Sequence, residues 1–344
     1  MSDAYTLVEN AALAPLNTLR VAATARWLAT VREAAALPAV LALPAARGPV
    51  LVLGEGSNIL FAADFAGLVL QLSFAGSSVV ADDGTTATVR AEAGVGWNSF
   101  VDWTLARGLG GLENLALIPG HVGAAPIQNI GAYGVEVAAS IECVEAWDLE
   151  SGRAVRIARD RCGFGYRDSL FKREPGRRIV TAVEFRLTRH APLRLDYAGV
   201  REELDAMGSS EPTAPQVAEA VRRLRRRKLP DPAVIGNAGS FFKNPVVEAA
   251  CATRLRESWP DLPVFDAGPD HRKLSAAWLI ERCGWRGQRD GDAGIAAQHA
   301  LVLVNHGRAS GAELLAFARR VADSVVERFG VRLEPEPRII GTQF

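Results

Sequence analysis

The segment LGEGSNILF (53–61) combines residue types that can bind an anion. Gly54 and Gly56 allow the backbone to turn its N–H groups toward a phosphate, and Ser57 and Asn58 add side-chain donors. A βαβ dinucleotide fingerprint needs a third glycine that opens a helix, but Ile59 stands there and extended chain follows. The segment predicts an anion-binding turn outside a βαβ unit, with an ordinary tight turn as the alternative.

A longer segment, GLGGLENLALIPGHVGAAPIQNIGAYG (108–134), has glycine at seven positions and polar side chains at Glu113, Asn114, Gln128 and Asn129. Such a stretch cannot build a core from its own side chains, but its backbone can wrap a ligand and offer many N–H donors. A flavin nucleotide, with two phosphates and a polar ring edge, suits this surface. The alternative, a structureless surface loop, is disfavoured by the length of the segment and its interspersed apolar residues.

Arg167 lies in FGYRDSLFK (164–172), where Tyr166 and Lys172 accompany it. An arginine can hold a carboxylate through two parallel hydrogen bonds. The segment therefore predicts a carboxylate contact, with a surface arginine on an amphipathic segment as the alternative.

Ser240 lies in KLPDPAVIGNAGSFFKNP (228–245) between Gly239 and two phenylalanines. A hydroxyl in so apolar a setting needs a hydrogen-bond partner or a chemical role. The segment has no G-x-S-x-G elbow, and no histidine base is paired with the serine, which argues against serine hydrolysis.

Two carboxylates near the C-terminus, Glu334 and Glu336 in RLEPEPRIIG (332–341), alternate with prolines. They are expected to project from one side of an extended segment, with simple surface exposure as the alternative.

Composition argues against several classes of protein. The 39 basic and 39 acidic residues give no net charge, so the chain as a whole has no attraction to nucleic acid or to a membrane surface. The basic run 222–228 lies at the end of a predicted helix, where we interpret it as a solvated face or a diphosphate contact. No apolar run approaches the roughly 20 residues that span a bilayer, and the N-terminus lacks signal-peptide character. We predict a cytoplasmic protein.

Cysteine and lysine usage adds two expectations. The four cysteines are widely spaced without a CxxC pair, which predicts reduced thiols. The sequence contains no His/Cys cluster with metal-ligand spacing, so we predict no metal site. Only four of the basic residues are lysines, and three of them lie within motifs described above, where a compact ammonium has uses that a guanidinium lacks. The four lysines are Lys172, Lys228, Lys243 and Lys273.

The elements that must position these motifs indicate an α+β protein. Residues 23–38 predict an amphipathic helix ended by Pro38, and 48–61 predict a buried strand, a glycine turn and further extended chain. Hairpins are predicted at 78–94 and 144–157, and another strand at 179–187.

Two helices are predicted in the C-terminal half. Val217, Val221 and Leu224 repeat at helical spacing. Ser310 and Glu313 form a capping-box pattern ahead of a helix that is expected to end at Gly330. Helices are therefore expected on both sides of a strand-rich middle.

Together the motifs resemble the UDP-N-acetylenolpyruvoylglucosamine reductase family, also called UDP-N-acetylmuramate dehydrogenases. The combination of GNAGSFFKNP with FGYRDS is highly specific, and LRLDYAGV (193–200) resembles the form that closes a tyrosine loop over the substrate. The matching segments follow the family's order and cover nearly the whole chain: NTLR (17–20), LGEGSN (53–58), GLENLALIPGHVGAAPIQNIGAYG (111–134), FGYRDSLFK (164–172), KLPDP (228–232), GNAGSFFKNP (236–245) and LEPEPRIIG (333–341).

The resemblance implies a three-domain FAD-binding fold of the vanillyl-alcohol-oxidase (PCMH) type with a C-terminal substrate-capping α/β domain. The implied domains are residues 1–76 with 329–344, residues 77–218, and a substrate-binding domain at 219–328. FAD would be bound non-covalently, with NADPH as co-substrate. NADPH would reduce FAD, and the reduced flavin would give hydride to C3 of UDP-N-acetylglucosamine enolpyruvate in peptidoglycan precursor synthesis.

The resemblance also implies roles for individual residues. Ser240 would give the proton at C2, and Arg167 and Glu336 would flank the enolpyruvyl carboxylate and the developing enolate. The chain departs from the family pattern at His299, where some relatives have glutamine, and at Pro337, where valine is expected. The implied FAD contacts are Gly54, Glu55, Gly56, Ser57, Asn58, Pro119, Gly120, Gly123, Ala124, Gln128, Asn129, Gly131, Ala132, Tyr133 and Gly134. The implied substrate contacts are Tyr166, Tyr197, Lys228, Asn244, Lys273 and His299.

Two other functions fit parts of the pattern. One is another flavin oxidoreductase of the same fold, such as an oxidase of hydroxy acids or sugars, which would have no use for a proton-donating Ser240. The other is a catalytically silent nucleotide-sugar-binding protein, which the joint presence of Arg167, Ser240 and Glu336 disfavours. By analogy with the family we expect a monomer that binds neither nucleic acid nor a membrane.

Overall fold

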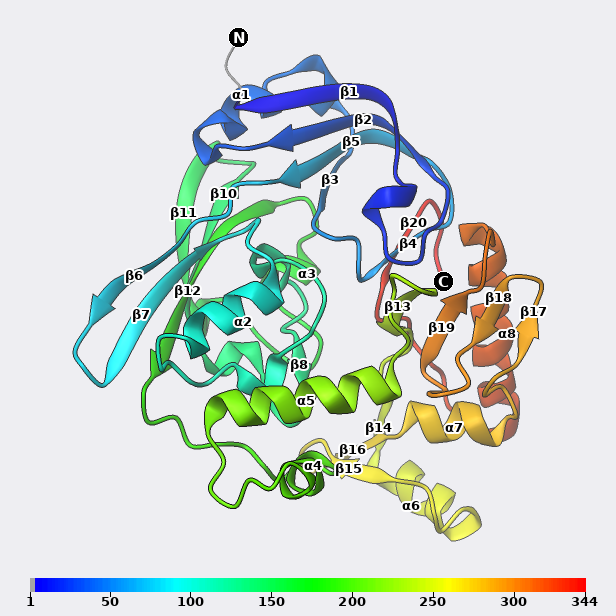
Figure 1. Cartoon of the computed structure of the whole chain (residues 1–344). Coiled ribbons are helices and arrows are strands. Elements are labelled where there is room, and N and C mark those ends of the chain that lie inside the picture. The colour runs from blue at the N-terminus through cyan, green and yellow to red at the C-terminus, as the bar shows by residue number, and fades with distance from the viewer. Residues whose placement is uncertain (1–3) are drawn as a thin grey trace. The chain divides into compact units, whose positions relative to one another are not determined.

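The computed structural model describes residues 4–344 (Figure 1). The chain divides into two compact units, each of which is described separately below. The first unit comprises the N-terminal stretch to Ala11, Ala25–Glu55 and Ala66–Arg226. The second unit comprises Ala12–Thr24, Gly56–Phe65 and Arg227–Phe344. No helix in the described part of the chain is long and apolar enough to cross a membrane.

A five-stranded antiparallel sheet forms the centre of the first unit, in the order β11-β10-β12-β7-β6. Both predicted hairpins are confirmed, with Gly84 and Gly152 at positive φ in their turns. The predicted strand at 179–187 is confirmed within β12. The strands are β6 (Ser77–Asp82), β7 (Thr86–Glu92), β10 (Ile141–Asp148), β11 (Arg153–Ala158) and β12 (Arg178–Thr188).

Helices α2 (Trp97–Leu105) and α5 (Ala214–Lys228) contribute to the core on this sheet. The Phe100 ring lies 4.9 Å from the Phe185 ring of β12, centroid to centroid, so aromatic packing fixes α2 against the strands. The prediction of helix α5 is confirmed, because Val217, Val221 and Leu224 are all buried along it. The shorter helices of this unit are α1 (Leu37–Leu41), α3 (Leu170–Arg173) and α4 (Val200–Ala206).

The predicted helix at 23–38 is wrong. Thr24–Val31 forms strand β2 instead, between β1 (Tyr5–Ala12) and β5 (Phe65–Leu72) in a sheet completed by β3 (Val50–Leu53). Ala29 and Val31 of this strand are buried in a packed core, and pairing with strands on both edges outweighs the helical propensity of the segment. Pro38 lies in the first turn of α1, where a proline ring is tolerated, and therefore begins a helix instead of ending one. In the described chain ahead of the strand-rich middle, the α-helix is the short α1, and strands make up most of the regular structure there.

The second unit contains two small antiparallel sheets and one parallel strand pair. Its first sheet has the order β13-β19-β18-β17 and its second β14-β16-β15, while β4 pairs with β20. The strands are β4 (Ile59–Phe61), β13 (Gly236–Ser240), β14 (Val246–Glu248), β15 (Val264–Asp266), β16 (His271–Leu274), β17 (Arg289–Asp290), β18 (Ala293–Ile295), β19 (Val302–Asn305) and β20 (Arg338–Ile340).

Three helices accompany these strands: α6 (Ala249–Ser258), α7 (Ala276–Arg282) and α8 (Gly311–Phe329). Figure 1 shows α8 running beside β18 and β19, which it contacts. The predicted capping box is confirmed, with the Ser310 hydroxyl accepting from the Glu313 N–H and the Glu313 carboxylate accepting from the Ser310 N–H. Gly330 ends the helix at φ +66°.

Candidate active site

Arg167 stands in a tight turn of the first unit. Gly165 and Asp168 exchange backbone hydrogen bonds of 3.0 and 3.2 Å across this turn, and Arg167 takes φ +53°, an unusual value for a residue other than glycine. Its Nη2 donates to the Gly131 carbonyl at 2.9 Å, and Lys172 Nζ donates to the Arg167 carbonyl at 3.0 Å. The guanidinium is thus held at the glycine-rich segment 108–134, while Lys172 fixes the backbone of the same residue.

Asn129 fastens that turn to the glycine-rich segment. Its Nδ2 donates to the Gly165 carbonyl at 3.0 Å and to Glu136 Oε2 at 2.8 Å, while its Oδ1 accepts from the Ala138 N–H at 3.0 Å. All three bonds stay within the protein, so the predicted contact of Asn129 with FAD would have to come from its backbone. Ser169 adds a second link through its hydroxyl, which donates to the Ile127 carbonyl at 2.5 Å.

Backbone N–H groups fix the turn at residues 119–124, which contains the predicted FAD contacts Pro119, Gly120, Gly123 and Ala124. The Gly120 N–H donates to Glu55 Oε2 at 2.8 Å, which brings two predicted FAD contacts together. The Gly123 N–H donates to the Ala93 carbonyl at 3.0 Å, and a Cβ atom at Gly123 would lie only 2.5 Å from that of Ala93. Glycine is required at 123 because the backbone packs directly on strand β7's end.

Tyr133 and Gly134 form the turn of a small hairpin within the predicted flavin segment. Both residues have positive φ, +49° and +79°, and they connect β8 (Gly131–Ala132) to β9 (Val135–Glu136). The Tyr133 ring meets the Tyr197 ring edge to face at 5.1 Å between centroids. The structure therefore brings a predicted FAD contact and a predicted substrate contact side by side in the first unit. Gln128 precedes this hairpin, and exposed Tyr166 adjoins Arg167 in the turn 165–168.

Arg225 is a functional candidate that the sequence analysis did not single out. It lies in the basic run 222–228, and its Nε donates to the Leu117 carbonyl at 3.1 Å. Part of the side chain is exposed, but its guanidinium is buried deeply enough to lower the pKa of the group, and the Arg167 charge lowers it further. Within the described residues no carboxylate pairs with it. The signal in the sequence is its helical phase, which places it next to inward-facing Val221 and Leu224.

Glu336 and Ser240 are brought to neighbouring positions in the second unit. The Glu336 N–H donates to the Phe241 carbonyl at 2.8 Å, and the Lys243 N–H donates to the Glu334 carbonyl at 2.9 Å. The segment 334–336 therefore lies antiparallel to the residues that follow Ser240. Pro337 is compatible with this arrangement, because the next N–H, that of Arg338, makes the bond to the Asn58 carbonyl at 3.1 Å.

Asn58 also fixes the backbone of Glu336. Its Nδ2 donates to the Glu336 backbone carbonyl at 3.3 Å, so Asn58 of the predicted anion-binding turn contacts the main chain of the predicted catalytic residue within the second unit. Gly56 of the same turn has φ +63°, and a Cβ atom there would lie 2.1 Å from the Leu16 carbonyl oxygen. Only glycine fits at position 56 for this reason. Ser57 lies between Gly56 and Asn58 in the turn.

Ser240 lies at an irregularity in strand β13, where the register against β19 shifts between Asn237 and Ser240. Such bulges re-aim side chains and are common beside active sites. Asn237 stabilises the bulge, with its Oδ1 accepting from the Gly239 N–H at 3.0 Å. Ser240 is half-buried, and its hydroxyl has no hydrogen-bond partner among residues 4–344. The hydroxyl is therefore available to a ligand.

The predicted substrate contacts Lys228 and His299 lie near one another in the second unit. Burial lowers the pKa of His299, and the charges of Lys228 and Arg286 lower it further, so the ring is neutral at physiological pH. His299 Nδ1 accepts from the Leu301 N–H at 3.2 Å, and the Leu301 carbonyl accepts from the Phe241 N–H at 2.7 Å. These bonds connect His299 to the strand that carries Ser240.

Asn244 lies just before a small sheet of the same unit, and Lys273 lies within that sheet. Asn244 Oδ1 accepts from the Ala276 N–H at 2.9 Å at the start of α7, which leaves its amide group as a donor. Lys273 is in the central strand β16, paired with Val246 on one side and Phe265 on the other. Both apolar neighbours are 48% exposed. Phe265 is therefore a candidate substrate contact that the sequence did not reveal.

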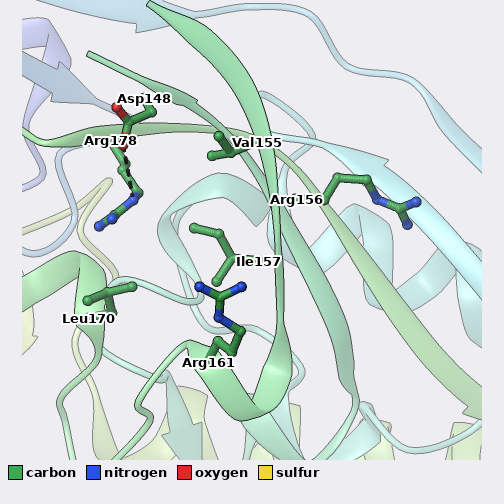
Figure 2. Close-up of a pocket in the computed structure, with 7 residues that line it drawn as sticks. All are labelled: Asp148, Val155, Arg156, Ile157, Arg161, Leu170 and Arg178. Atoms are coloured by element: carbon green, nitrogen blue, oxygen red, sulfur yellow. Dashed lines mark ion pairs between the residues drawn. The ribbon is translucent and has the colours of Figure 1, made fainter. Parts of the chain in front are cut away.

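A separate pocket of about 240 Å³ lies in the first unit, and no predicted site residue lines it (Figure 2). It is lined by Asp148, Val155, Arg156, Ile157, Arg161, Leu170 and Arg178. Arg178 pairs with Asp148, and Arg156 pairs with Glu184 at 2.6 Å, so these charges are already compensated. The Ser151 N–H and Arg177 hold the pKa of Asp148 at about 2. The pocket is not the candidate active site.

Two family models match the chain. The model described as "FAD binding domain" matches residues 25–158, and that described as "UDP-N-acetylenolpyruvoylglucosamine reductase, C-terminal domain" matches residues 231–340. Together they include most of the residues described above.

Full-length relatives and solved structures agree with these matches. The UDP-N-acetylenolpyruvoylglucosamine reductase of Xanthomonas euvesicatoria pv. vesicatoria is 55% identical over 100% of both chains. That of Xanthomonas campestris pv. campestris (strain B100) is 56% identical over 99% of this chain and 98% of its own.

Among solved structures, the UDP-N-acetylenolpyruvylglucosamine reductase of Thermus caldophilus is 27% identical, with a TM-score of 0.66 over 97% of this chain and 98% of that one. A cholesterol oxidase from Brevibacterium sterolicum, 10% identical with a TM-score of 0.50 over 98% of this chain and 87% of that one, shares the fold alone. The predicted fold class, an FAD-binding fold of the PCMH type, is confirmed. The chain belongs to the UDP-N-acetylenolpyruvoylglucosamine reductase family.

Proposed function

We propose that this protein uses bound FAD and NADPH to reduce UDP-N-acetylglucosamine enolpyruvate to UDP-N-acetylmuramate, a step of peptidoglycan precursor synthesis. The observation that carries the proposal is the identity of 55% with a named reductase along the entire chain. We further propose that it acts as a cytoplasmic monomer with the three domains predicted above. The four cysteines are free thiols, which supports a reducing compartment.

The residues of the first unit fit a bound flavin nucleotide. Arg225 is a buried cation without a carboxylate partner among residues 4–344, and a buried charge is stable only when something compensates it. A group that carries negative charge beside Leu117 and Tyr133 would do so. FAD, when bound, supplies hydride transfer between NADPH and the enolpyruvyl group. We propose that the glycine-rich segment and the turn at 53–58 hold it through the residues predicted from the resemblance.

Ser240 is the proposed proton donor to C2. A serine hydroxyl is a weak acid, but an enolate is basic enough to accept its proton when the hydroxyl is already in position. The half-buried place of Ser240 at a strand bulge, with no protein partner in the described chain, supports this role.

Arg167 and Glu336 are proposed to bind the substrate's carboxylate and stabilise the enolate. A guanidinium can grip a carboxylate through two hydrogen bonds and stabilises negative charge that develops next to it. The strained backbone of Arg167 and its bond to Gly131 support a fixed orientation, which such a role requires.

We propose that Tyr166, Tyr197, Lys228, Asn244, Lys273 and His299 bind the UDP-sugar. Lys228 offers a point charge next to the neutral ring of His299, which suits a diphosphate or carboxylate oxygen.

Lys228→Ala is expected to raise KM for the sugar nucleotide with little change in kcat. Loss of a hydrogen bond to a charged group corresponds to roughly 1.5–3 kcal/mol, or about 10- to 150-fold in KM. Arg223→Ala is the matched control, because Arg223 is another exposed cation of α5 and already pairs with Glu219 at 3.0 Å. Steady-state kinetics of both variants checks the prediction. Equal KM values for wild type and Lys228→Ala would show that Lys228 is a solvated residue at the end of α5 that does not contact the substrate.

Acid precipitation of the purified protein is expected to release all of its FAD into the supernatant. Covalent attachment in flavoproteins generally uses histidine or cysteine, and His121 is the histidine of the glycine-rich segment. Its ring faces the Glu55 carboxylate at 3.7 Å, and burial lowers its pKa. The absorbance of supernatant and pellet at the flavin bands is the measurement, and yellow colour retained in the pellet would refute non-covalent binding.

The reaction itself separates the proposed function from its rivals. The flavin bands of fresh protein should bleach with NADPH and recover on addition of the enolpyruvyl sugar nucleotide under nitrogen. An oxidase would recover rapidly in air instead, and a silent binding protein would purify without colour.

A further inference from the structure

The residues 189–199, here called the tyrosine segment, lie against the glycine-rich segment in the first unit. A Cβ atom at Gly110 would be 3.0 Å from that of Ala191, and Leu193 and Leu195 pack against the core beneath. At the far end Tyr197 meets Tyr133 edge to face. The two segments are therefore in contact along much of the tyrosine segment.

Asn114 is a polar link between these two segments. Its Nδ2 donates to the Tyr133 carbonyl at 3.0 Å and to the Arg194 carbonyl at 2.8 Å, so both of its N–H groups are used. One bond fixes the turn that carries Tyr133, and the other fixes the tyrosine segment three residues before Tyr197. Asn114 itself is 1% exposed within a short 3₁₀ turn, η4 (Glu113–Leu115).

The presence of asparagine here is not explained by packing. Its Oδ1 is buried and accepts no hydrogen bond within residues 4–344. A buried acceptor without a donor is unfavourable, and an apolar side chain of similar shape would avoid that penalty. The two N–H bonds are what an apolar side chain would lose, so they are the feature that requires asparagine.

We propose that Asn114 is a positioning residue that holds the tyrosine segment against the glycine-rich segment and thereby sets the position of Tyr197. This inference rests on the proposed function, in which Tyr197 contacts the UDP-sugar. Asn114 acts through Tyr197 and Tyr133, and need not touch the substrate.

Limited trypsin digestion tests the link without any substrate, because the Arg194 carbonyl belongs to a bond that trypsin cleaves. Asn114→Leu should be nicked after Arg194 faster than wild type. A typical hydrogen bond corresponds to about 2- to 13-fold in the equilibrium for local opening, and the nicking rate should rise by that order. Asn98→Leu is the matched control, since Asn98 Oδ1 accepts from the Leu117 N–H at 2.8 Å and so fastens the same glycine-rich segment elsewhere.

A double-mutant cycle with Tyr197→Ala distinguishes the positioning of Tyr197 from a general weakening of sugar-nucleotide binding. The dissociation constant for the sugar nucleotide, measured from the change in flavin absorbance, should rise in each single variant. In the double variant the Asn114→Leu change should add little, because the side chain that it positions is gone.

Two results would overturn the proposal: nicking after Arg194 at the wild-type rate in Asn114→Leu, or fully additive effects in the cycle. If Asn114→Leu does not purify with flavin, the same measurements are made on Asn114→Ser, whose side chain is smaller and polar. A wild-type protein that does not reduce the sugar nucleotide would refute the proposed function and leave the nicking result standing.

Discussion

Ser240→Ala is expected to be reduced by NADPH at close to the wild-type rate and to react with the enolpyruvyl sugar nucleotide far more slowly. Removing a positioned general acid typically lowers the rate of the step it serves by about 10²- to 10⁴-fold, or about 3–5.5 kcal/mol in the barrier. Reduction by NADPH needs no proton at C2, so only the second step should suffer. Stopped-flow absorbance at the flavin band measures each step separately.

The structure indicates that this variant will fold. The Ser240 hydroxyl makes no hydrogen bond within the described chain, and the bulge is held by Asn237 instead. Little stability is therefore lost with one oxygen atom, and the variant should purify yellow. Ser240→Cys is a matched control, because its thiol keeps a donatable proton at the same place and should recover part of the rate.

A wild-type rate for the sugar nucleotide in Ser240→Ala would contradict the proposal. Ser240 would then be a packing residue of β13, and the proton would come from another group, such as Glu336 or water.

Local patterns predicted several elements of the fold. The hairpins at 78–94 and 144–157 were predictable because their turns need residues that tolerate positive φ, which Gly84 and Gly152 supply. The helix after Ser310 was predictable because its capping box satisfies the first N–H groups locally. The strand at 24–31 was not, because it depends on β1 and β5 on either side of it, and a short window contains no sign of them.

For the candidate site, too, local motifs were informative and long-range contacts were not. Motifs predicted Arg167 and Ser240 as residues for chemistry, but they did not reveal what holds them. Asn129 was predicted as a cofactor contact, whereas its side chain binds the turn beside Arg167 through Gly165, 36 residues away along the chain. Asn114 likewise acts on Arg194, which is 80 residues away. Such long-range hydrogen bonds leave no spacing pattern in the sequence.

The basic run 222–228 illustrates the limit most clearly. In the sequence its five arginines are equivalent, and solvation is a reasonable interpretation for each of them. In the structure Arg222 pairs with Asp102 and Arg223 with Glu219, whereas the Arg225 guanidinium is buried at Leu117. The position of each arginine around the helix distinguishes the exposed ones from Arg225. Whether a given position is buried depends on what packs against the helix.

Arg225→Met is expected to lower the rate of turnover by about 10²- to 10³-fold, the usual effect of removing one preorganised group that stabilises developing charge. Methionine keeps much of the length of the side chain and removes its charge. Arg226→Met is the matched control, because Arg226 is the next residue of α5, has the same chemistry and is exposed. Its rate should equal that of wild type.

The physical reason lies in the missing counter-charge. Arg225 keeps its proton at neutral pH although burial lowers its pKa and Arg167 adds a like charge nearby, so its cation raises the energy of the protein until negative charge arrives. The Leu117 carbonyl and Tyr133 place that cation in the segment proposed to hold FAD, so the reduced cofactor should benefit from it most. The midpoint potential of the flavin in Arg225→Met should therefore be more negative than in wild type, by on the order of tens of millivolts for a two-electron couple. An unchanged potential with a raised KM for the sugar nucleotide would instead assign Arg225 to the substrate, and equal behaviour of the Arg225 and Arg226 variants would remove it from the site.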